Sequence, residues 1–387
     1  MKSKRAFFLG ALVALMILPV MGIAESWAGF VKTVNAATKK AKGEVVVAAP
    51  DTVEGNEKGD PAIYVPKGAK LVIEGGSFEV MMLGGGDITL RGVNVQNPQN
   101  SRMAAIFIVS NGNKAVDLAL TIEEDTVIAS ETGSGIFWSF DYTKSPDIKL
   151  LIDNRGTISA GRENERIGIK ARGVEIVHRI TKSKKADITV RNSGAISGAI
   201  GIDVSIVNQG LSTASVVNEG KIDAVAGGIV ASVQSLNKKS SVTVENAGEV
   251  AASAESGSGI ALGVGSRIFQ KKPAGRGQVI NEGTVTGGQA GISVGTDYDP
   301  MLPIKLSGGG TARAESGPDE NARDIDIGLS LESWAGAPDQ AGFEQAVGPW
   351  LEENFAMDDL PEGTRVRVQL SAFSGEAPGP IAVEWVK

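Results

Sequence analysis

The stretch Val216-Val217-Asn218-Glu219-Gly220-Lys221-Ile222 decides the fold of this 387-residue chain, because the chain repeats it. The repeated frame is an apolar residue, one variable position, Asn, a variable residue, Gly, another variable residue, and Ile or Val. The five clear copies are residues 152–158, 190–196, 216–222, 244–250 and 279–285, and a sixth at 122–128 keeps the apolar frame but lacks Asn and Gly. Repeats of this length are typical of stacked architectures in which each repeat forms one coil.

The spacing within the frame predicts strands joined by a sharp bend. The apolar residues lie two positions before the Asn and four after it, and strands place alternate residues on one face. Asn and Gly tolerate the left-handed backbone of tight bends, so we expect strand, bend at Asn-x-Gly, and second strand. A Gly-Ile dipeptide marks a third strand in each repeat, with glycines Gly135, Gly168, Gly201, Gly228, Gly259 and Gly291.

The asparagine column indicates how the coils stack. Its successive positions, counted from 124, are 30, 38, 26, 28 and 35 residues apart, and the excess length falls between the Gly-Ile strand and the next frame. Insertions confined to one place are what a solenoid permits. Coils about 4.8 Å apart bring equivalent side chains together, and an Asn amide both donates and accepts hydrogen bonds. We therefore expect a structural Asn ladder made of Asn154, Asn192, Asn218, Asn246 and Asn281.

The repeat weakens towards both ends of the chain. Apolar runs predict about three earlier coils and one later, degenerate coil, at residues 71–76, 88–93, 105–109 and 306–329. Beyond these runs, the apolar period becomes helical from Phe343 to Phe355, with Asp339 as its expected start. Two strands follow, at Arg365–Phe373 and Ile381–Val386.

These patterns predict an all-β fold, a right-handed parallel β-helix of roughly ten coils that is about 45 Å long. We place the β-helix at residues 45–335, after a linker or N-terminal cap at 25–44. Residues 336–387 are expected to form a small α+β cap, a helix plus a β-hairpin, that covers the open end of the solenoid. A separate binding module is the alternative interpretation of these last residues.

The first 24 residues are predicted to be a secretory signal peptide. A basic start with Lys2, Lys4 and Arg5 precedes an apolar run at 6–23, and small residues precede Glu25. Two alternatives stay open: an uncleaved membrane anchor, because the run approaches a spanning length, and cleavage after Ala28. We expect an exported protein (periplasmic, on the outer surface or secreted) with no integral membrane segment after cleavage.

The composition of the chain limits the classes of partner that we expect. The chain has no cysteine, so we expect neither disulfides nor a lipid on an N-terminal cysteine. Without the three basic residues of the leader, 35 Lys and Arg stand against 45 Asp and Glu, a net charge of −10. An acidic surface argues against nucleic acid as the partner. Fifty glycines and 5% aromatic residues are typical of many tight turns around a thin core.

The repeats carry no recurring set of reactive side chains. His178 is the single histidine and stands in an apolar strand, so we interpret it as a structural residue rather than a catalytic base. The sequence has no nucleophile elbow, phosphate loop or HExxH motif, and Gly84-Gly85-Gly86-Asp87 is a lone fragment of a calcium repeat that we interpret as a turn. We predict no catalytic, cofactor-binding or metal-binding residues, and no cofactor.

β-Helix enzymes place paired carboxylates on adjacent coils of one outer face. The positions that flank the Asn column are not consistently acidic. Glu123 and Asp153 are the one pair expected to stack, and we interpret them as solvated turn charges. In the aromatic cluster at residues 137–142, alternation points Trp138 inward and Phe137 outward, and one outward ring does not form a sugar-binding platform.

Together, the Asn-x-Gly-x-Ile coils, the export signal and the lack of cysteine resemble the passenger regions of bacterial autotransporters and related haemagglutinin-like adhesins. The resemblance covers about residues 45–330 and implies a right-handed parallel β-helix displayed at the cell surface. The chain departs from that pattern at residues 339–387, which are too short and too acidic for the C-terminal membrane barrel of autotransporters.

The expected function is therefore that of an exported, non-enzymatic adhesin-like or surface structural protein that presents loops on a β-helix. Its expected partner is a glycan or a host or cell-surface protein. The alternative is a polysaccharide lyase or hydrolase on the same scaffold, since such coils carry several functions. A third class is a self-assembling coat or stalk, for which we expect self-association.

Overall fold

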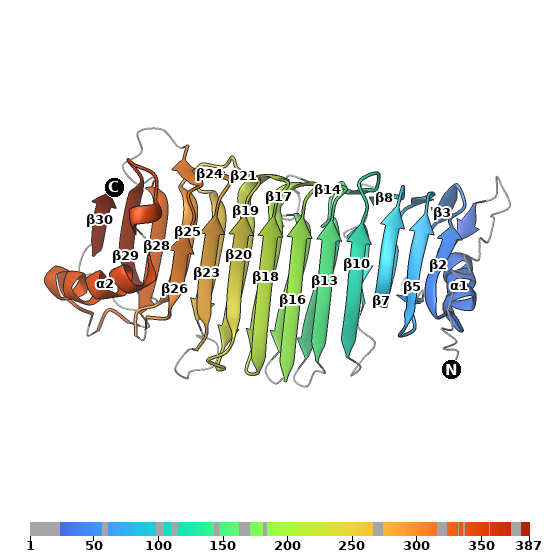
Figure 1. The fold of residues 1–387 in the computed structure, drawn as a ribbon, viewed down its shortest axis with the longest axis horizontal. Helices are drawn as coiled ribbons and strands as arrows, with labels where there is room; N and C mark the ends of the chain where they lie inside the picture. The colour runs from blue at the N-terminus through green and yellow to red at the C-terminus, as the bar shows by residue number, and fades with distance from the viewer. Residues whose placement is uncertain are drawn as a thin grey trace, which may run out of the picture.

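The computed structural model describes residues 24–55, 61–97, 104–109, 115–142, 147–161, 171–180, 184–265, 274–299, 301–315, 323–331, 333–335, 337–355, 357–372 and 381–387. The apolar run of the predicted signal peptide lies outside the described residues. Within these ranges the chain is an elongated stack of strands with the N-terminal end at one tip and the C-terminal end at the other (Figure 1). None of the helices within these ranges is both apolar enough and long enough to cross a bilayer.

Each coil contributes one strand to each of three faces, which we call the first, second and third face. The first face consists of β2 (Gly43–Ala48), β5 (Ala69–Glu74), the second part of β7 (Met81–Arg91), β10 (Val116–Ile122), β13 (Ile148–Asn154), β16 (Lys185–Asn192), β18 (Leu211–Asn218), β20 (Ser241–Asn246), β23 (Arg276–Asn281) and β26 (Ile304–Ser307). This is the front sheet of Figure 1.

The other two faces form the back of the stack. The second face holds β1 (Glu25–Ser26), β3 (Thr52–Glu54), β6 (Ser77–Phe78), β8 (Asn94–Asn97), β11 (Val127–Ser130), β14 (Thr157–Ala160), β21 (Glu249–Ala252), β24 (Thr284–Gly287) and β27 (Thr311–Ala314). The third face holds β4 (Ile63–Tyr64), the first part of β7, β9 (Ile106–Ile108), β12 (Ile136–Tyr142), β15 (Arg172–Ile180), β22 (Ser258–Gly265), β25 (Ala290–Asp297) and β28 (Arg323–Leu331). Two long strands, β17 (Ala195–Asn208) and β19 (Lys221–Ser235), run from the second face into the third.

The predicted fold class is confirmed. Equivalent strands of successive coils pair in parallel along each face. In Figure 1 the chain climbs the front sheet, crosses over the top to the back, and advances from β2 to β26. That path is a right-handed coil, so the molecule is an all-β, right-handed parallel β-helix.

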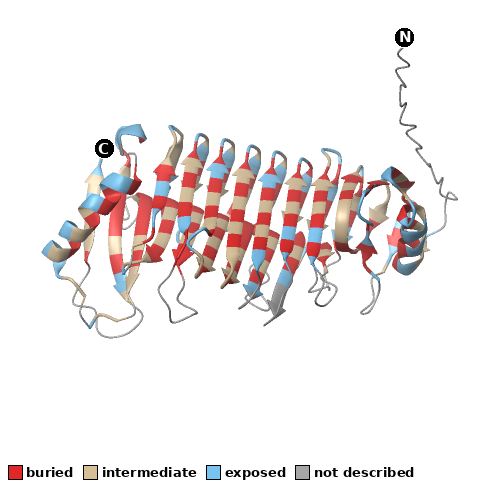
Figure 2. Ribbon diagram, turned by 60° about the horizontal axis from the view of Figure 1, so that its bottom comes forward, coloured by how far each residue is buried: buried red, intermediate tan, exposed pale blue. Residues whose placement is uncertain are grey.

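Alternation along each strand builds the core. In β18, Ala214 and Val216 are fully buried, whereas Thr213 and Ser215 on the opposite side are half-exposed. The buried bands repeat from coil to coil and form stripes along the stack (Figure 2). Full burial of an Ile or Val side chain stabilises the fold by about 1.5–3 kcal/mol. The interior is therefore a continuous apolar column, and the outward positions are free to differ.

The five asparagines of the predicted ladder lie at adjacent positions at the ends of first-face strands. Each of the first four donates an Nδ2 hydrogen to the Oδ1 of the asparagine on the next coil, at 2.8, 2.8, 2.7 and 2.9 Å along the series. The last one, Asn281, donates to the carbonyl oxygen of Thr311 at 3.1 Å. At the other end, Asn154 Oδ1 has no hydrogen-bond partner among the described residues, because the coil before it presents Ile122.

The turn glycines next to this ladder permit close stacking. They do not adopt the left-handed backbone that the Asn-x-Gly pattern predicts: none of them has a positive φ. They are Gly156, Gly194, Gly220, Gly248 and Gly283. A Cβ placed on any of the last four would lie 2.1 Å from the carbonyl oxygen of the turn glycine on the preceding coil. The physical reason for glycine here is therefore the short distance between successive turns.

The Gly-Ile column follows the same principle, with one correction. A Cβ on Gly201 would lie 2.3 Å from Ile222 Cγ2 and 2.6 Å from the oxygen of Gly228 on the next coil. Strand pairing aligns Val174 with Ile136 and Ile202, so the glycine of this coil is Gly173. The prediction of Gly168 was wrong in register. The next strand, β15, begins only at Arg172, and it has Val174 where the other coils have Ile. Gly168 itself lies outside the described residues.

A second register correction concerns the first, degenerate copy of the frame. Ile122, not Glu124, pairs with Asn154, and Val127 pairs with Thr157. The turn between the two strands is therefore two residues longer in this coil than in the next. The sequence alone does not reveal this insertion, because the apolar residues on both sides of the turn also fit the spacing of the repeated frame.

The N-terminal end of the stack is covered by α1 (Trp27–Thr38). Ser26 caps this helix by accepting a hydrogen bond from the Gly29 amide at 3.2 Å. Trp27 and Phe30 are buried against Phe78 of β6, with ring centroids 6.4 and 5.2 Å apart. Trp27 also donates its Nε1 hydrogen to the carbonyl oxygen of Pro61 at 2.8 Å. The helix thus seals the apolar interior that an open first coil would expose.

The C-terminal end is closed by α2 (Gln340–Asn354), a short 3₁₀ turn (Met357–Asp359), β29 (Arg365–Ala372) and β30 (Ala382–Val386). Asp339 caps α2, and Phe343, Val347 and Leu351 are buried on its inner side. β29 pairs in parallel with β28 and so extends the third face by one strand. β30 then returns antiparallel to β29. The β-sheet therefore continues past residue 335.

Candidate functional site

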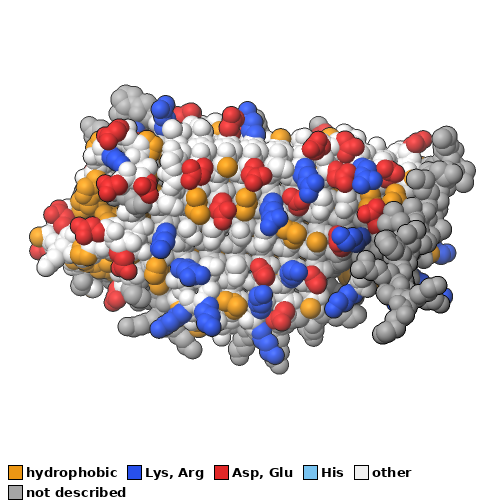
Figure 3. Space-filling view, viewed as in Figure 1, with side chains coloured by type: hydrophobic (Ala, Val, Ile, Leu, Met, Phe, Trp, Pro, Cys, Tyr) orange, Lys and Arg blue, Asp and Glu red, His pale blue; other side chains and the backbone are white. Residues whose placement is uncertain are grey.

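The first face presents charges of both signs, and Figure 3 shows them interspersed over that face. Arg91 lies between two carboxylates, 2.8 Å from Glu123 and 3.6 Å from Glu74. The hydrogen bond with Glu123 raises the pKa of the Arg91 guanidinium. These pairs are solvent-exposed and contribute little to stability, so we interpret them as structural charges.

The predicted Glu123 and Asp153 pair does not form. Thr121 is the residue that stands beside Asp153, and Glu123 lies in the longer turn, where it binds Arg91. Asp153 instead forms an ion pair with Arg155, at 2.8 Å. The fragment Gly84-Gly85-Gly86-Asp87, predicted to be a turn, lies within the long strand β7.

The third face carries aromatic, charged and small side chains at its outward positions. Its outward residues form columns along the axis, one residue per coil. The first column reads Phe107, Phe137, Glu175, Asp203, Val230, Ala261, Ser293, Asp326 and Arg367, and the second reads Ser139, Val177, Ser205, Ser232, Gly263, Gly295, Gly328 and Gln369. Aromatic, charged and small residues therefore follow one another along a single face.

Two aromatic rings meet at the N-terminal end of the first column. Phe107 and Phe137 pack edge to face with ring centroids 5.4 Å apart, and both are half-buried. Phe137 points outward and Trp138 is fully buried, as alternation predicted. Phe137 is therefore not a lone outward ring, and the repeat alone does not reveal its register with Phe107. The two rings form a small aromatic step at this end of the third face.

The next two coils of the column carry a network of paired charges. Glu175 and Asp203 stand side by side on β15 and β17. Arg172 reaches both carboxylates, at 3.0 Å from Glu175 and 2.7 Å from Asp203. Ser134 donates to Glu175 at 2.6 Å and Ser205 donates to Asp203 at 3.0 Å. Both carboxylates are thus largely buried, paired and fixed in position.

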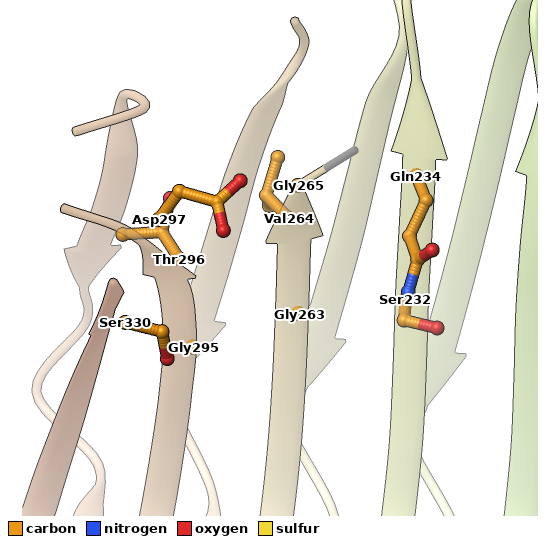
Figure 4. Close-up of a pocket in the computed structure, with 9 residues that line it drawn as sticks. All are labelled: Ser232, Gln234, Gly263, Val264, Gly265, Gly295, Thr296, Asp297 and Ser330. Atoms are coloured by element: carbon orange, nitrogen blue, oxygen red, sulfur yellow. The ribbon is translucent and has the colours of Figure 1, made fainter. Parts of the chain in front are cut away.

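A shallow hollow of about 350 Å³ opens farther along the same face. It crosses β19, β22, β25 and β28 (Figure 4) and is lined by Ser232, Gln234, Gly263, Val264, Gly265, Gly295, Thr296, Asp297 and Ser330. The Asp297 carboxylate extends from β25 towards Gly265 on β22, and the Gln234 side chain folds alongside Ser232 (Figure 4). The hollow exists because glycines occupy outward positions in the middle of adjacent strands.

His178 lies in the core of the third face. It is fully buried, and its ring stacks on Trp138 at a centroid distance of 5.5 Å and an interplanar angle of 12°. Desolvation by burial lowers the pKa of His178 to about 4. The imidazole is therefore neutral at pH 7 and faces the interior rather than the surface. This arrangement agrees with the structural role that the sequence suggested.

The described residues contain no group of three or more His, Cys, Asp or Glu side chains arranged to hold a metal ion. Comparisons with models of known protein families, with curated proteins and with solved structures find no match to this chain.

Proposed function

We propose that this protein is an exported, non-enzymatic, adhesin-like β-helix that binds a glycan along its third face. The observation that carries the proposal is the axial order of that face, where an aromatic step, a fixed charge network and a hollow follow one another on successive coils. Coils are about 4.8 Å apart, so the face offers a row of subsites to an extended chain.

The charge network supports binding rather than turnover. A general acid must be able to donate a proton to the substrate, and a general base must be able to accept one. Glu175 and Asp203 share the Arg172 guanidinium, and each also accepts a hydroxyl hydrogen bond. Carboxylates fixed in this way are suited to orienting a ligand through the remaining donors and acceptors of the cluster.

The proposal is tested with purified mature protein on a glycan array, followed by titration of the best ligand with matched variants. Phe137→Ala removes the aromatic step and should weaken binding about tenfold, because a stacked ring contributes roughly 1 kcal/mol or more. Leu151→Ala is the control, since Leu151 is an equally half-exposed apolar residue on the first face. Absence of any glycan binding, or equal losses in both variants, would contradict the proposal.

A second function, a polysaccharide lyase or hydrolase, is favoured by one observation: Glu175 and Asp203 occupy equivalent positions on neighbouring coils. Paired carboxylates on one face are the arrangement that glycosidases use. Incubation with a panel of polysaccharides, with product release measured for wild type and Glu175→Gln, decides between the two. Products that disappear in the variant would establish the enzyme and exclude the non-enzymatic proposal.

A further inference from the structure

The first face has a row of cations along the border where the chain enters it from the third face. From β13 to β26, the connections between these faces and the first two residues of the first-face strands contain seven described Lys and Arg residues. They are Lys149, Lys184, Lys185, Lys238, Lys239, Arg276 and Lys305, and all seven are exposed. Figure 3 shows Lys and Arg gathered along this lower border of the face. We call these seven residues the basic corner.

Few carboxylates balance the basic corner. Asp147, Asp187 and Asp299 are the described carboxylates in the same connections and in the first three residues of the same strands. Asp187 forms an ion pair with Lys185 at 3.3 Å. The other six cations form no ion pair and no side-chain hydrogen bond among the described residues. Exposed cations without such partners repel one another, and an anionic ligand removes that repulsion.

The opposite border of the same strands, where the chain turns to the second face, has the reverse balance. The last two residues of each strand, the turn, and the first residue of the next strand contain five carboxylates and three cations. These residues are Asp153, Glu219, Glu245, Glu249 and Glu282, with Arg155, Arg191 and Lys221. Arg155 lies 2.8 Å from Asp153, and Lys221 lies 3.9 Å from Glu249. Cations are thus mixed with carboxylates at one border and gathered at the other.

The basic corner has the shape of a narrow row. Pairing from β13 through β16, β18, β20 and β23 to β26 makes five coil steps, so the row is roughly 24 Å long at about 4.8 Å per step. The exposed large hydrophobic residues among the described ones are Tyr64, Val127 and Val386, and none belongs to the row. The row therefore has no described apolar side chain to insert into a membrane and no exposed ring to stack on a nucleic-acid base.

We propose that the basic corner binds the acidic groups of a linear polysaccharide that carries carboxylates or sulfates along its length. This inference rests on the proposed glycan-binding function and narrows its ligand to an acidic glycan. The third-face strands β22 and β25 lead through their connections into β23 and β26, so a glycan along the third face has these cations on one side. Lysine ammonium groups act as compact point charges, which suits them to either kind of acidic group.

The test measures the affinity of the mature protein for two matched pairs of ligands: oligogalacturonate with its methyl ester, and dextran sulfate with dextran. The corner variant combines Lys149→Gln, Lys238→Gln and Arg276→Gln. The control variant combines Arg155→Gln, Arg191→Gln and Lys221→Gln at the opposite border. Both variants lose three positive charges, so an effect of net charge alone is the same in the two. Both should keep the melting temperature of wild type, because exposed substitutions of this kind change stability little.

We expect wild type to bind an acidic ligand about tenfold or more tightly than its neutral counterpart, and the corner variant to lose about tenfold in affinity. The control variant should keep most of the affinity, and added salt should weaken the acidic ligand in wild type more than in the corner variant.

Equal losses in the two variants overturn the basic corner, because net charge then explains the binding. Binding of single-stranded DNA or of phosphatidylglycerol vesicles as tight as that of the acidic glycans overturns it as well. Equal affinity for acidic and neutral ligands overturns the basic corner and leaves the proposed function standing. Failure to bind any glycan removes the proposed function and this inference together.

Discussion

At the scale of single residues, the asparagine ladder is a buried chain of directed hydrogen bonds. Its five members are 0–3% exposed, and each amide nitrogen points to the next coil. A buried polar group without a partner costs about 1–3 kcal/mol, so every member depends on its neighbours. The ladder therefore links one coil to the next at the corner where the backbone leaves the first face.

Asn218→Ala tests this link in the middle of the ladder. The substitution removes the bonds to Asn192 and Asn246 and leaves their polar atoms buried without that partner, so we expect a loss of about 1–3 kcal/mol in the free energy of unfolding. Urea denaturation measures the loss. Glu219→Ala, one exposed position away, should change the free energy little; equal effects of the two substitutions would contradict the ladder.

His178 gives the stability of the fold a pH dependence. Its pKa is about 4 in the folded protein and about 6.5 when unfolded, so the unfolded chain binds the proton more tightly between these values. Stability is therefore full above pH 6.5 and falls as the pH drops towards 4. We expect a loss of about 2 kcal/mol between pH 7 and pH 5 from this residue.

His178→Phe supplies the comparison, because phenylalanine keeps an aromatic ring next to Trp138 and does not titrate. Urea midpoints at pH 7 and pH 5 should differ less in the variant than in wild type. An unchanged pH dependence in the variant would assign the effect to other groups.

Residue patterns predicted the ladder well, because Asn has the same distance to both strands in five copies. They gave the wrong reason for the turn glycines, since the approach of the preceding turn is a property of the stack and not of one repeat. The aromatic step, the charge network and the hollow were missed. They consist of the outward residues of each third strand. These residues can be recognised as columns only when the register between coils is known.

At the scale of elements, the contacts of the N-terminal cap predict where the proposed signal peptide is cleaved. Cleavage after residue 24 would leave Glu25 and Ser26, which pair with β3 and cap α1. Cleavage after Ala28 would remove Trp27 and its contact with Phe78. We therefore expect the exported protein to begin at Glu25.

Mass spectrometry of the exported, purified protein determines this end. A mature chain that starts at Gly29 would show that the solenoid tolerates loss of the Trp27 contact, and a chain that retains its leader would favour the membrane anchor. Recovery of the protein only inside the cell would contradict the proposed export.

The elements that sequence reasoning placed correctly are those whose apolar period is long or repeated, such as the first-face strands and the α2 helix. It failed at the turn after Ile122 and at the strand that begins with Arg172. In both coils the connection between strands differs in length from that of the other repeats. A second alignment to the repeated frame places apolar residues at the same positions, so the sequence fits both. Only strand pairing distinguishes the two spacings.

At the scale of the whole molecule, the interior, the first face and the third face differ in the side chains that they carry. The interior is shared by all coils and holds the stack together, the first face carries paired surface charges, and the third face varies along the axis. A solenoid allows this division because each coil contacts only its neighbours, so outward residues can change without disturbing the core. The proposed glycan face depends on the register that brings residues far apart in sequence into one column.

A cysteine cross-link measures that register most directly, because the natural chain has no cysteine to interfere. Thr189 on β16 pairs with Ser215 on β18, and both side chains point outward on the first face. Adjacent strands are about 4.8 Å apart, within disulfide reach, whereas Thr189 and Val217 are offset by two residues and about 8 Å apart. We predict that Thr189→Cys with Ser215→Cys forms an intramolecular disulfide on mild oxidation and that Thr189→Cys with Val217→Cys does not. Efficient cross-linking of the offset pair and none of the aligned pair would contradict the stacked fold.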